Sequence, residues 1–352
     1  MATQADIPII DLAGDQDTVA RQLVDAAEEH GFIYIKNLGH DISVRDVDEA
    51  FHLSRKLFDA PVQEKEACTI QTNNRGWSGM HSEVLDPQNQ KVGDFKEAFN
   101  FGEFIDGKAQ QPLPPTIASD EPQLSAFAHS CHSLCQKILA RLGRGLQVDD
   151  FFSSAHVLPT TAGSSDSILR FLRYPPVDPT ARSTEDLRAG AHSDYGSITL
   201  LFRLKGQAGL ELEKKNGEWA PVPVCPPGSE DDAGPPILVN IGDLLSYWTN
   251  GLFRSTNHRV VFNDDHGNGD RKNTVSGETN SGPRYSIAYF CHPAGHVRLE
   301  PVPSERVQGH VKSGSSTTNP YAERKVLTAR EHLFVRLKET YGSLYNDKTP
   351  GP

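Results

Sequence analysis

Residues 192–204 read HSDYGSITLLFRL, a short polar stretch followed directly by a continuous apolar run. Apolar runs of this length, bounded by turn residues, are typical of buried strands. Similar runs recur on both sides of this one, at SILRFLRY (167–174), GLELEKKNGEW (209–219), PPILVNIG (235–242), STNHRVVFN (255–263) and RYSIAYFCH (284–292). Their spacing predicts an all-β barrel or sandwich as the core of the protein.

The regions on either side of this core are predicted to be mostly helical. Residues 1–166 carry apolar positions at helical spacing, most clearly in a long stripe over residues 121–146. Residues 304–352 end in a further helix, which Thr328 and Glu331 would open as a capping box. Helices are therefore expected to wrap the β core from both ends of the chain.

Two stretches rich in Gly, Asp, Asn and Pro, 226–236 and 263–282, interrupt the run of strands. Such a composition is typical of loops, and we predict insertions at both places within a core of residues 167–303. No internal repeat divides the chain. We expect one composite domain over residues 1–352, mainly β with α.

Composition and charge exclude several classes of protein. The chain has 352 residues, 46 acidic and 35 basic side chains, and a formal net charge of -11. Binding to a nucleic-acid backbone depends on clustered Lys and Arg, so the acidic surplus argues against it. No window approaches the roughly 18 apolar residues that a membrane span needs, and the N-terminus lacks the layout of a secretory signal. We expect a cytoplasmic protein with a small-molecule substrate and no nucleic-acid or membrane partner. Its oligomeric state is left open.

Two histidines and one aspartate in the β region form a candidate metal site. His192 and Asp194 are two residues apart, so on a strand they point to the same face, and a later strand brings in His258. Two nitrogens and one oxygen on a single side of a metal leave three positions open, which is the arrangement that non-haem Fe(II) oxygenases use. The HxD triplet alone is weak, because the chain has 14 histidines.

A second pair strengthens this interpretation. Arg284 and Ser286 share one face of a later predicted strand. A guanidinium and a hydroxyl two residues apart can hold a carboxylate by charge-assisted hydrogen bonds. The alternative is a half-buried arginine in a structural ion pair.

The chain resembles the 2-oxoglutarate- and Fe(II)-dependent oxygenases of the isopenicillin N synthase-like superfamily, and the likeness spans nearly its whole length. The segments that carry it are IPIIDL (7–12), GFIYIKN (31–37), NRGW (74–77), HSDYGSITLL (192–201), NIGDLL (240–245), STNHRVV (255–261) and PRYSIAYF (283–290). Among members of the superfamily, this sequence most resembles the fungal thymine dioxygenase-like proteins. The resemblance implies a double-stranded β-helix, or jelly roll, wrapped by helices.

The same resemblance implies the cofactors and their residues. His192, Asp194 and His258 would be both the metal ligands and the catalytic residues, holding Fe(II), with 2-oxoglutarate and O2 as cosubstrates. Arg284 and Ser286 would bind the distal carboxylate of 2-oxoglutarate, and Tyr174 would add its hydroxyl.

The chain departs from the family pattern at two neighbouring positions. Leu172 stands where plant-type members have Asn, so that contact to the cosubstrate is absent or replaced. Arg173 could add an anion contact or simply face solvent. Isopenicillin N synthase itself uses the Arg-x-Ser pair on its substrate, so the pair predicts carboxylate binding only.

Strand parity extends the prediction to the substrate. If Tyr174 points into the barrel, so does Arg170, and if Arg284 points inward, so does Phe290. Tyr195, next to Asp194, can lean over the metal. A pocket with two aromatic faces and a guanidinium suits a flat polar ring, or a small molecule with a carboxylate and an apolar body. The resemblance to fungal thymine dioxygenase-like proteins implies a nucleobase-like heterocycle, and an amino acid or secondary metabolite is the alternative. Ordinary core packing is the alternative for each of these side chains, and Trp77 and residues 99–101 are weaker candidates.

The same residues are compatible with other functions. Alternatives for the reaction are an oxidase without 2-oxoglutarate, ethylene-forming fragmentation of 2-oxoglutarate, a zinc-dependent hydrolase, or a binding protein without turnover. A zinc site on the long predicted helix is disfavoured, because its cysteines fall on the apolar stripe and no second pair follows at finger spacing. The four side chains concerned are His129, Cys131, His132 and Cys135.

Overall fold

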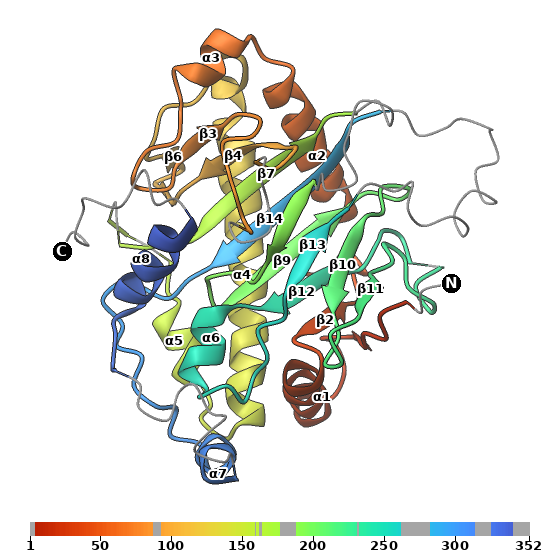
Figure 1. Cartoon of the computed structure of the whole chain (residues 1–352), viewed down its shortest axis with the longest axis vertical. Helices are drawn as coiled ribbons and strands as arrows, with labels where there is room; N and C mark the ends of the chain where they lie inside the picture. The colour runs from red at the N-terminus through yellow and green to blue at the C-terminus, as the bar shows by residue number, and fades with distance from the viewer. Residues whose placement is uncertain are drawn as a thin grey trace.

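The computed structural model describes residues 4–86, 93–158, 160–161, 164–176, 188–230, 232–261, 282–313 and 325–340. Within them, two β-sheets face each other and helices pack around them (Figure 1). Of the predicted loop 263–282, only the last residue is described. The other predicted loop, 226–236, carries no helix or strand over its described residues.

The larger sheet has eight strands in the order β1-β2-β12-β9-β14-β7-β4-β3. Neighbouring strands pair antiparallel, apart from the parallel pair β1 and β2. Both edges of this sheet come from residues 1–166, so that region supplies strands to the core as well as helices. The division of the chain at residues 166 and 303 stays a prediction. The strands are β1 (Ile9–Ile10), β2 (Phe32–Ile35), β3 (Gly76–Ser78), β4 (Glu97–Phe101), β7 (Ile168–Tyr174), β9 (Ile198–Arg203), β12 (Ile237–Ile241) and β14 (Arg284–Cys291).

The smaller sheet has four strands in the order β11-β10-β13-β8. Asn216 and Gly217 form the turn between β10 and β11, where Gly217 has a φ of 80° that favours glycine. A two-stranded sheet, β5 (Phe104–Ile105) with β6 (Lys108–Ala109), lies apart from both larger sheets. The strands of the four-stranded sheet are β8 (Ala189–His192), β10 (Leu210–Glu213), β11 (Trp219–Pro221) and β13 (His258–Val260).

Alternation along the strands gives the larger sheet two different faces. On β7, Leu169 and Phe171 pack into the core that the sheet shares with the helices. Leu172 and Tyr174 point the opposite way, into a second cluster shared with the smaller sheet, and Ala288 of β14 joins them. Because side chains alternate with a period of two, one strand serves both cores. The space between the two sheets is where the candidate site lies.

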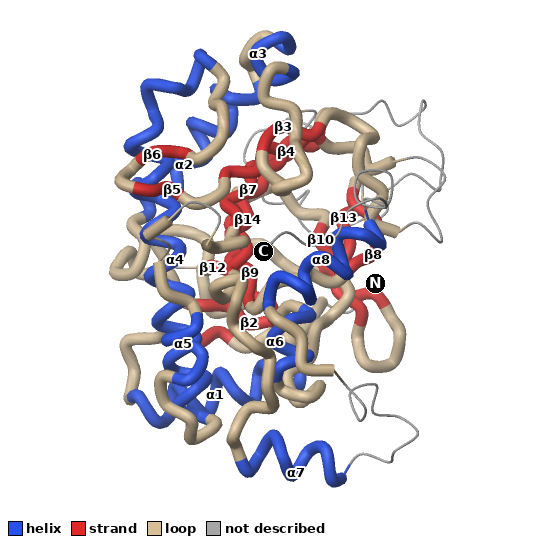
Figure 2. The backbone as a smooth tube through the Cα atoms, turned by 90° about the vertical axis from the view of Figure 1, so that its left-hand side faces the viewer, coloured by secondary structure: helices blue, strands red, loops and turns tan. Residues whose placement is uncertain are grey.

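Helices cover the face of the larger sheet that is turned away from the smaller sheet (Figure 2). The longest, α4, spans Glu121–Gly145, close to the predicted residues 121–146. Side chains cap two of the other helices: Asp15 accepts from the Thr18 amide at 3.0 Å, and Ser43 from the Asp46 amide at 3.0 Å. The helices of this region are α1 (Gln16–Glu29), α2 (Val44–Phe58), α3 (Val62–Glu66), the 3-10 helix η1 (Pro115–Asp120), α4 and α5 (Phe151–Ala155).

The remaining helices are α6 (Asp243–Trp248), α7 (Glu305–Ser313) and α8 (Ala329–Thr340). Glu331 accepts from the Thr328 amide at 2.7 Å, and the Glu331 amide donates to the Thr328 hydroxyl at 3.2 Å. The predicted capping box is therefore confirmed. The helix α7 lies in the region 304–352 that was predicted to be helical, although no individual helix was predicted at these residues.

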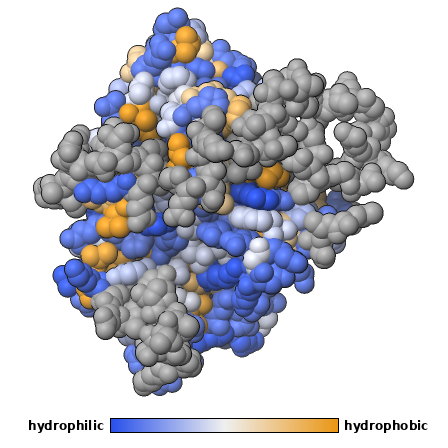
Figure 3. Space-filling view, in the orientation of Figure 1, coloured by the Kyte–Doolittle hydropathy of each residue, from blue (hydrophilic) through white to orange (hydrophobic). Residues whose placement is uncertain are grey.

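The face shown in Figure 3 is mostly hydrophilic, with hydrophobic residues scattered among polar ones. Scattered surface hydrophobics of this kind are normal and mark no binding surface. No helix in the described part of the chain is long and apolar enough to cross a membrane.

Candidate active site

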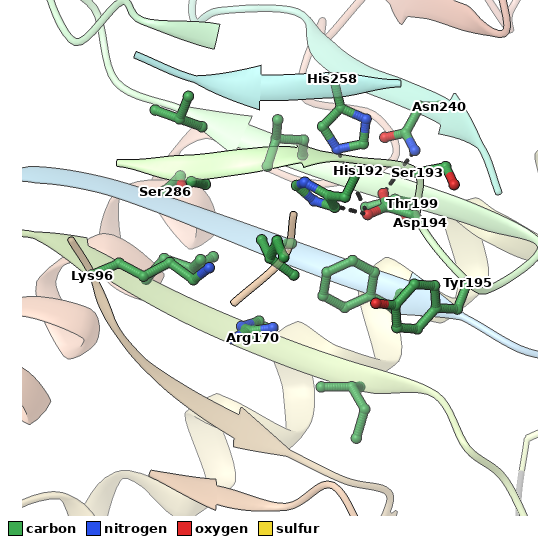
Figure 4. A pocket seen from close by; sticks show the side chains of 18 of the residues that line it. Lys96, Arg170, His192, Ser193, Asp194, Tyr195, Thr199, Asn240, His258 and Ser286 are labelled. Atoms are coloured by element: carbon green, nitrogen blue, oxygen red, sulfur yellow. Dashed lines mark hydrogen bonds and ion pairs between the residues drawn. The ribbon is translucent and has the colours of Figure 1, made fainter. Parts of the chain in front are cut away.

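The three predicted metal ligands lie together between the two sheets. His192 ends β8, His258 begins β13, and the two residues are direct partners in the smaller sheet. Asp194 follows in the turn after β8. Its Oδ1 lies 3.8 Å from Nε2 of His192 and 3.7 Å from Nε2 of His258 (Figure 4). Among the described residues, these three side chains form the one group of histidine, cysteine or acidic residues close enough to share a metal ion.

Backbone carbonyls orient both imidazoles. Nδ1 of His192 donates to the Gly190 carbonyl at 2.7 Å, and Nδ1 of His258 donates to the Thr256 carbonyl at 3.2 Å. In a neutral ring Nε2 would then be the unprotonated nitrogen, and both Nε2 atoms face Asp194. Burial, followed by the neighbouring His258, lowers the pKa of His192 to about 4, which favours the neutral ring that a metal requires.

The described residues hold the Asp194 carboxylate by hydrogen bonds to only one of its two oxygens. Its Oδ2 accepts hydrogen bonds from Thr199 Oγ1 and from Asn240 Nδ2, both at 2.7 Å. Burial alone would raise the pKa of Asp194, but the two histidines and these hydrogen bonds outweigh it and lower the pKa. The side chain is therefore a carboxylate, with Oδ1 directed at the two histidines. Two imidazole nitrogens and one carboxylate oxygen are a suitable donor set for Fe(II) with open positions.

The predicted carboxylate-binding pair lies in the same cavity. Nε of Arg284 donates to the Ala208 carbonyl at 3.0 Å, and the guanidinium lies 4.8 Å from the ring centre of Tyr174. Nη1 of Arg284 is buried and has no hydrogen-bond partner among the described residues. Burial lowers the pKa of Arg284, yet arginine remains charged in proteins. A buried cation with an open N–H group fits an anionic ligand, and Ser286 lines the same part of the cavity.

One cavity of about 1080 Å³, including its open mouth, joins the metal site to Arg284. Arg170, Tyr195 and Phe290, the three predicted substrate contacts, all line it. The alternation of side chains along the strands predicted Arg170 and Phe290 correctly. Arg170 shares a face of β7 with Tyr174, and Phe290 shares a face of β14 with Arg284. Whether they touch a substrate stays a prediction.

Several weaker candidates lie elsewhere. Arg173 points to the opposite face of β7, where its Nη1 lies 3.0 Å from Glu97 Oε1, so it adds no anion contact to the cavity. Trp77 donates to the same carboxylate at 3.0 Å and does not line the cavity. Phe99 and Phe101 pack in the helix-side core, whereas Asn100 between them lines the cavity.

Among the described residues, the cysteines and histidines of α4 belong to no group close enough to share a metal ion. Cys131 and Cys135 are buried, unpaired thiols, and burial raises the pKa of each well above its ordinary value. His132 is hydrogen-bonded to the Tyr289 hydroxyl at 3.3 Å. These side chains pack as part of the core, as expected for an apolar stripe.

Sequence reasoning missed other side chains in the cavity wall, notably Lys96, Asn74, His292, Leu333 and Leu337. Lys96, Ala98 and Asn100 alternate along and just before β4, and this period of two was the signal that could have located Lys96. The two leucines come from α8, and nothing local in the sequence indicates that the last described helix closes one side of the cavity.

Comparisons with known proteins agree with this geometry. The model of the 2OG-Fe(II) oxygenase superfamily matches residues 165–293, and the N-terminal model of non-haem dioxygenases in morphine synthesis matches residues 7–121. The chain is 33% identical to a UPF0676 protein of Schizosaccharomyces pombe, covering 96% of this chain and 93% of that protein. It is 31% identical to the proline hydroxylase buaE of Petromyces alliaceus, covering 93% and 95%.

Among solved structures, a full-length Neurospora crassa protein in complex with alpha-KG and thymine is similar, with a TM-score of 0.73 and 26% identity over 96% of this chain and 99% of that one. The predicted fold class, a helix-wrapped jelly-roll core, is thereby confirmed. The predicted enzyme class and its need for iron and 2-oxoglutarate are confirmed as well. The chain belongs to the 2-oxoglutarate- and Fe(II)-dependent oxygenase superfamily and is a 2-oxoglutarate-dependent dioxygenase.

Proposed function

We propose that this dioxygenase oxidises a C–H bond of a small molecule at an iron site formed by His192, Asp194 and His258. The observation that carries the proposal is the orientation of the three donor atoms. Two Nε2 atoms and one Oδ1 atom face each other, while the second heteroatom of every side chain is engaged by the protein. Such outer contacts fix ligands for a metal and set their protonation.

Bound Fe(II), with 2-oxoglutarate and O2, supplies the oxidation: 2-oxoglutarate is converted to succinate and CO2 while the substrate C–H bond is oxidised. The chain contributes placement. His192, Asp194 and His258 would hold the metal by three donor atoms, which would leave coordination positions for cosubstrate and O2. Phe290, Leu333 and Leu337 present apolar surface to the cavity.

Arg284 and Ser286, with Tyr174, are proposed to hold the distal carboxylate of 2-oxoglutarate. The open Nη1 of Arg284 supports this assignment, since a buried guanidinium gains most from a charged acceptor. The stacked ring of Tyr174 and the two carbonyls that accept from Nε keep the guanidinium in one orientation. An enzyme that used this pair on the substrate instead would turn over without 2-oxoglutarate.

Arg170, Tyr195 and Phe290 are proposed to contact the substrate. Known relatives support two substrate classes: the similar Neurospora crassa protein has been solved with thymine, and buaE is a proline hydroxylase. A nucleobase-like heterocycle or an amino acid or secondary metabolite is therefore proposed, with hydroxylation as the reaction and desaturation, cyclisation or ethylene formation as variants. A role in secondary metabolism, a cytoplasmic location and the absence of a nucleic-acid partner remain predictions from the sequence.

Succinate formation tests the proposal. Purified protein with Fe(II), 2-oxoglutarate and air is screened against free nucleobases and amino acids. An oxygenase releases succinate slowly alone and faster with its substrate, and replacing Fe(II) by Zn(II) abolishes the release. Hydrolysis of a substrate with Zn(II) and no succinate would favour the hydrolase, and no turnover of any kind would favour a binding protein.

A further inference from the structure

Asn100 puts an uncharged polar side chain into the wall of the cavity. It lies on β4, where it pairs directly with Gly76 of β3 and with Arg170 of β7. Directly opposed residues of an antiparallel pair place their side chains on the same face of a sheet. Arg170 points into the cavity that contains His192 (Figure 4), and Asn100 lines the same cavity while being only 2% exposed.

The orientation of the Asn100 amide is fixed by Asn74. Nδ2 of Asn100 donates to the Asn74 carbonyl at 3.0 Å and to the Asn74 Oδ1 at 3.1 Å. A backbone carbonyl can only accept a hydrogen bond, so the amide nitrogen of Asn100 must be the atom that faces it. The Oδ1 of Asn100 is therefore turned away from Asn74. This oxygen is buried and has no hydrogen-bond partner among the described residues.

The NRGW segment (74–77) and the residues before it hold Asn74 in place. Asn74 has a φ of 60°, a left-handed conformation that asparagine adopts more readily than most residues. Its amide donates to the Gln71 carbonyl at 2.9 Å, and Oδ1 of Asn73 accepts from the Arg75 amide at 3.1 Å. These hydrogen bonds fix the turn that leads into β3. The turn thus presents the Asn74 carbonyl in one direction.

A buried acceptor in a cavity wall favours a ligand that donates to it. Buried polar atoms nearly always have a hydrogen-bond partner, because losing hydration without replacing it is unfavourable. Water can donate to the Asn100 oxygen while the cavity is empty of ligand. A ligand that displaces this water binds well only if it replaces the lost hydrogen bond.

We propose that Asn100 is a specificity-determining residue, whose Oδ1 accepts a hydrogen bond from an N–H or O–H group of the substrate. Asn74 is the positioning residue that turns this oxygen towards the cavity. The inference rests on the proposed function and deepens it, because it selects substrates by a donor group at one place. A site built to pair a buried acceptor rejects a molecule of the same shape that lacks the donor.

Two neutral rings of nearly equal shape test this inference. 2-Pyridone has a ring N–H, whereas 2-pyrone has a ring oxygen at that position, and both carry the same carbonyl group. Binding is measured by calorimetry on the full chain saturated with Fe(II) and 2-oxoglutarate under argon, so that no turnover interferes. The native chain should bind 2-pyridone at least about tenfold more tightly, because 2-pyrone leaves the buried oxygen unpaired.

Variants of the two asparagines should change this preference in a defined order. Asn100→Leu has a similar shape without the acceptor, so 2-pyridone should bind about tenfold more weakly and 2-pyrone no more weakly than before. Asn74→Gly accepts the φ of 60° but lacks Oδ1, so the preference should fall to an intermediate value. Asn74→Asp retains both acceptors for the Asn100 amide and should keep the native preference.

Gln111→Leu is the matched control. Nε2 of Gln111 donates to the backbone carbonyl of Asn100 at 3.3 Å, but Gln111 does not line the cavity. The variant removes a hydrogen bond to the same residue without changing the cavity wall, so the preference for 2-pyridone should be unchanged. Far-ultraviolet circular dichroism establishes that each variant is folded.

Native protein that binds the two rings equally, or binds neither of them, would overturn the inference. Asn100→Leu protein that keeps the native preference would overturn it as well, including the case in which both rings lose affinity by the same factor. Succinate formation with Fe(II) and 2-oxoglutarate in air is measured on the same proteins. A preference for the donor ring without succinate would refute the oxygenase alone, and succinate without that preference would refute the role of Asn100 alone.

Discussion

Two ion clusters lie on opposite faces of strand β7, and in each of them a glutamate lies between a lysine and an arginine. In what we call the inner cluster, Glu83 lies between Lys96 and Arg170, and Lys96 also pairs with Asp94. In what we call the outer cluster, Glu97 lies between Lys65 and Arg173, at 3.2 and 3.0 Å. Arg170 and Arg173 are three residues apart on one strand, so their side chains take opposite faces. A glutamate, a lysine and an arginine are thus common to both clusters, and the face of the sheet decides which cluster reaches the cavity.

The surroundings of the two clusters differ in a way that explains their roles. The described contacts of the outer cluster are hydrogen bonds to other parts of the fold and not to the cavity. Trp77 donates to Glu97, and Lys65 and Arg173 donate to the Phe58 carbonyl. It ties α2 and α3 to the larger sheet. The inner cluster instead leaves Lys96 and Arg170 on the wall of the cavity. An ion cluster marks a candidate binding site when part of its donor set faces an open space.

Removing the carboxylate of Glu83 from the inner cluster should have the largest effect on stability. Glu83→Ala leaves Arg170 and Lys96 buried with one carboxylate between them, and losing one partner of a buried ion pair costs about 3–5 kcal/mol. Urea unfolding followed by circular dichroism measures the difference. A loss below about 1 kcal/mol, the range of exposed ion pairs, would show that the inner cluster is more solvated than its burial indicates.

Acid should weaken the inner cluster in a defined range of pH. Burial would raise the pKa of Glu83, but Arg170 and Lys96 outweigh burial and lower it from 4.5 to about 2. A carboxyl whose pKa is lower in the folded state stabilises the fold above the unfolded pKa, and this contribution is lost as pH falls towards the folded pKa. Between about pH 5 and pH 2 the native chain should therefore lose about 3 kcal/mol more than Glu83→Gln, which has no carboxyl to protonate. Parallel losses in the two proteins would contradict the assignment.

Arg284 sharpens the comparison, because it lies on the inner face without a carboxylate partner among the described residues. Arg284→Ala should raise the concentration of 2-oxoglutarate needed for half-maximal succinate formation by roughly ten- to a hundredfold, since one charge-assisted hydrogen bond contributes about 1.5–3 kcal/mol. Arg173→Ala, on the outer face, is the control and should leave that concentration unchanged. An unchanged requirement in Arg284→Ala would indicate that the pair serves the substrate.

The outer cluster should show the smallest effect. Glu97→Gln keeps the shape of the side chain, and Arg173 is 24% exposed, so water can replace part of the lost contact. A loss of about 1–2 kcal/mol in unfolding free energy is expected, without any change in 2-oxoglutarate requirement. If this variant altered cosubstrate binding, the two faces of β7 would not be independent.

Local patterns in the sequence predicted much of this arrangement. Period-two alternation located Arg170 and Phe290 in the cavity, and the HxD triplet with the later histidine predicted a group that the structure brings together. Alternation also could have shown that Arg173 faces away from the cavity, since Tyr174 faces into it.

The inner cluster could not be predicted in the same way. Glu83 and Asp94 lie outside any strand or helix, where no periodicity fixes the direction of a side chain. Arg170, the partner of Glu83, is 87 positions from it in the sequence, and only the packing of a loop against β7 brings the two together. The closure of the cavity by Leu333 and Leu337 likewise depends on where α8 docks.

Iron binding is the most direct test of the central claim, that His192, Asp194 and His258 hold one ferrous ion. Equilibrium dialysis under argon should give one Fe(II) per native chain, and Asp194→Ala should reduce the affinity by more than about a hundredfold, because a ligand matters more than the outer contacts that cost roughly ten- to a hundredfold. Glu97→Gln should bind iron normally. Asp194→Ala protein that still holds one equivalent of Fe(II) with native affinity would contradict the assignment.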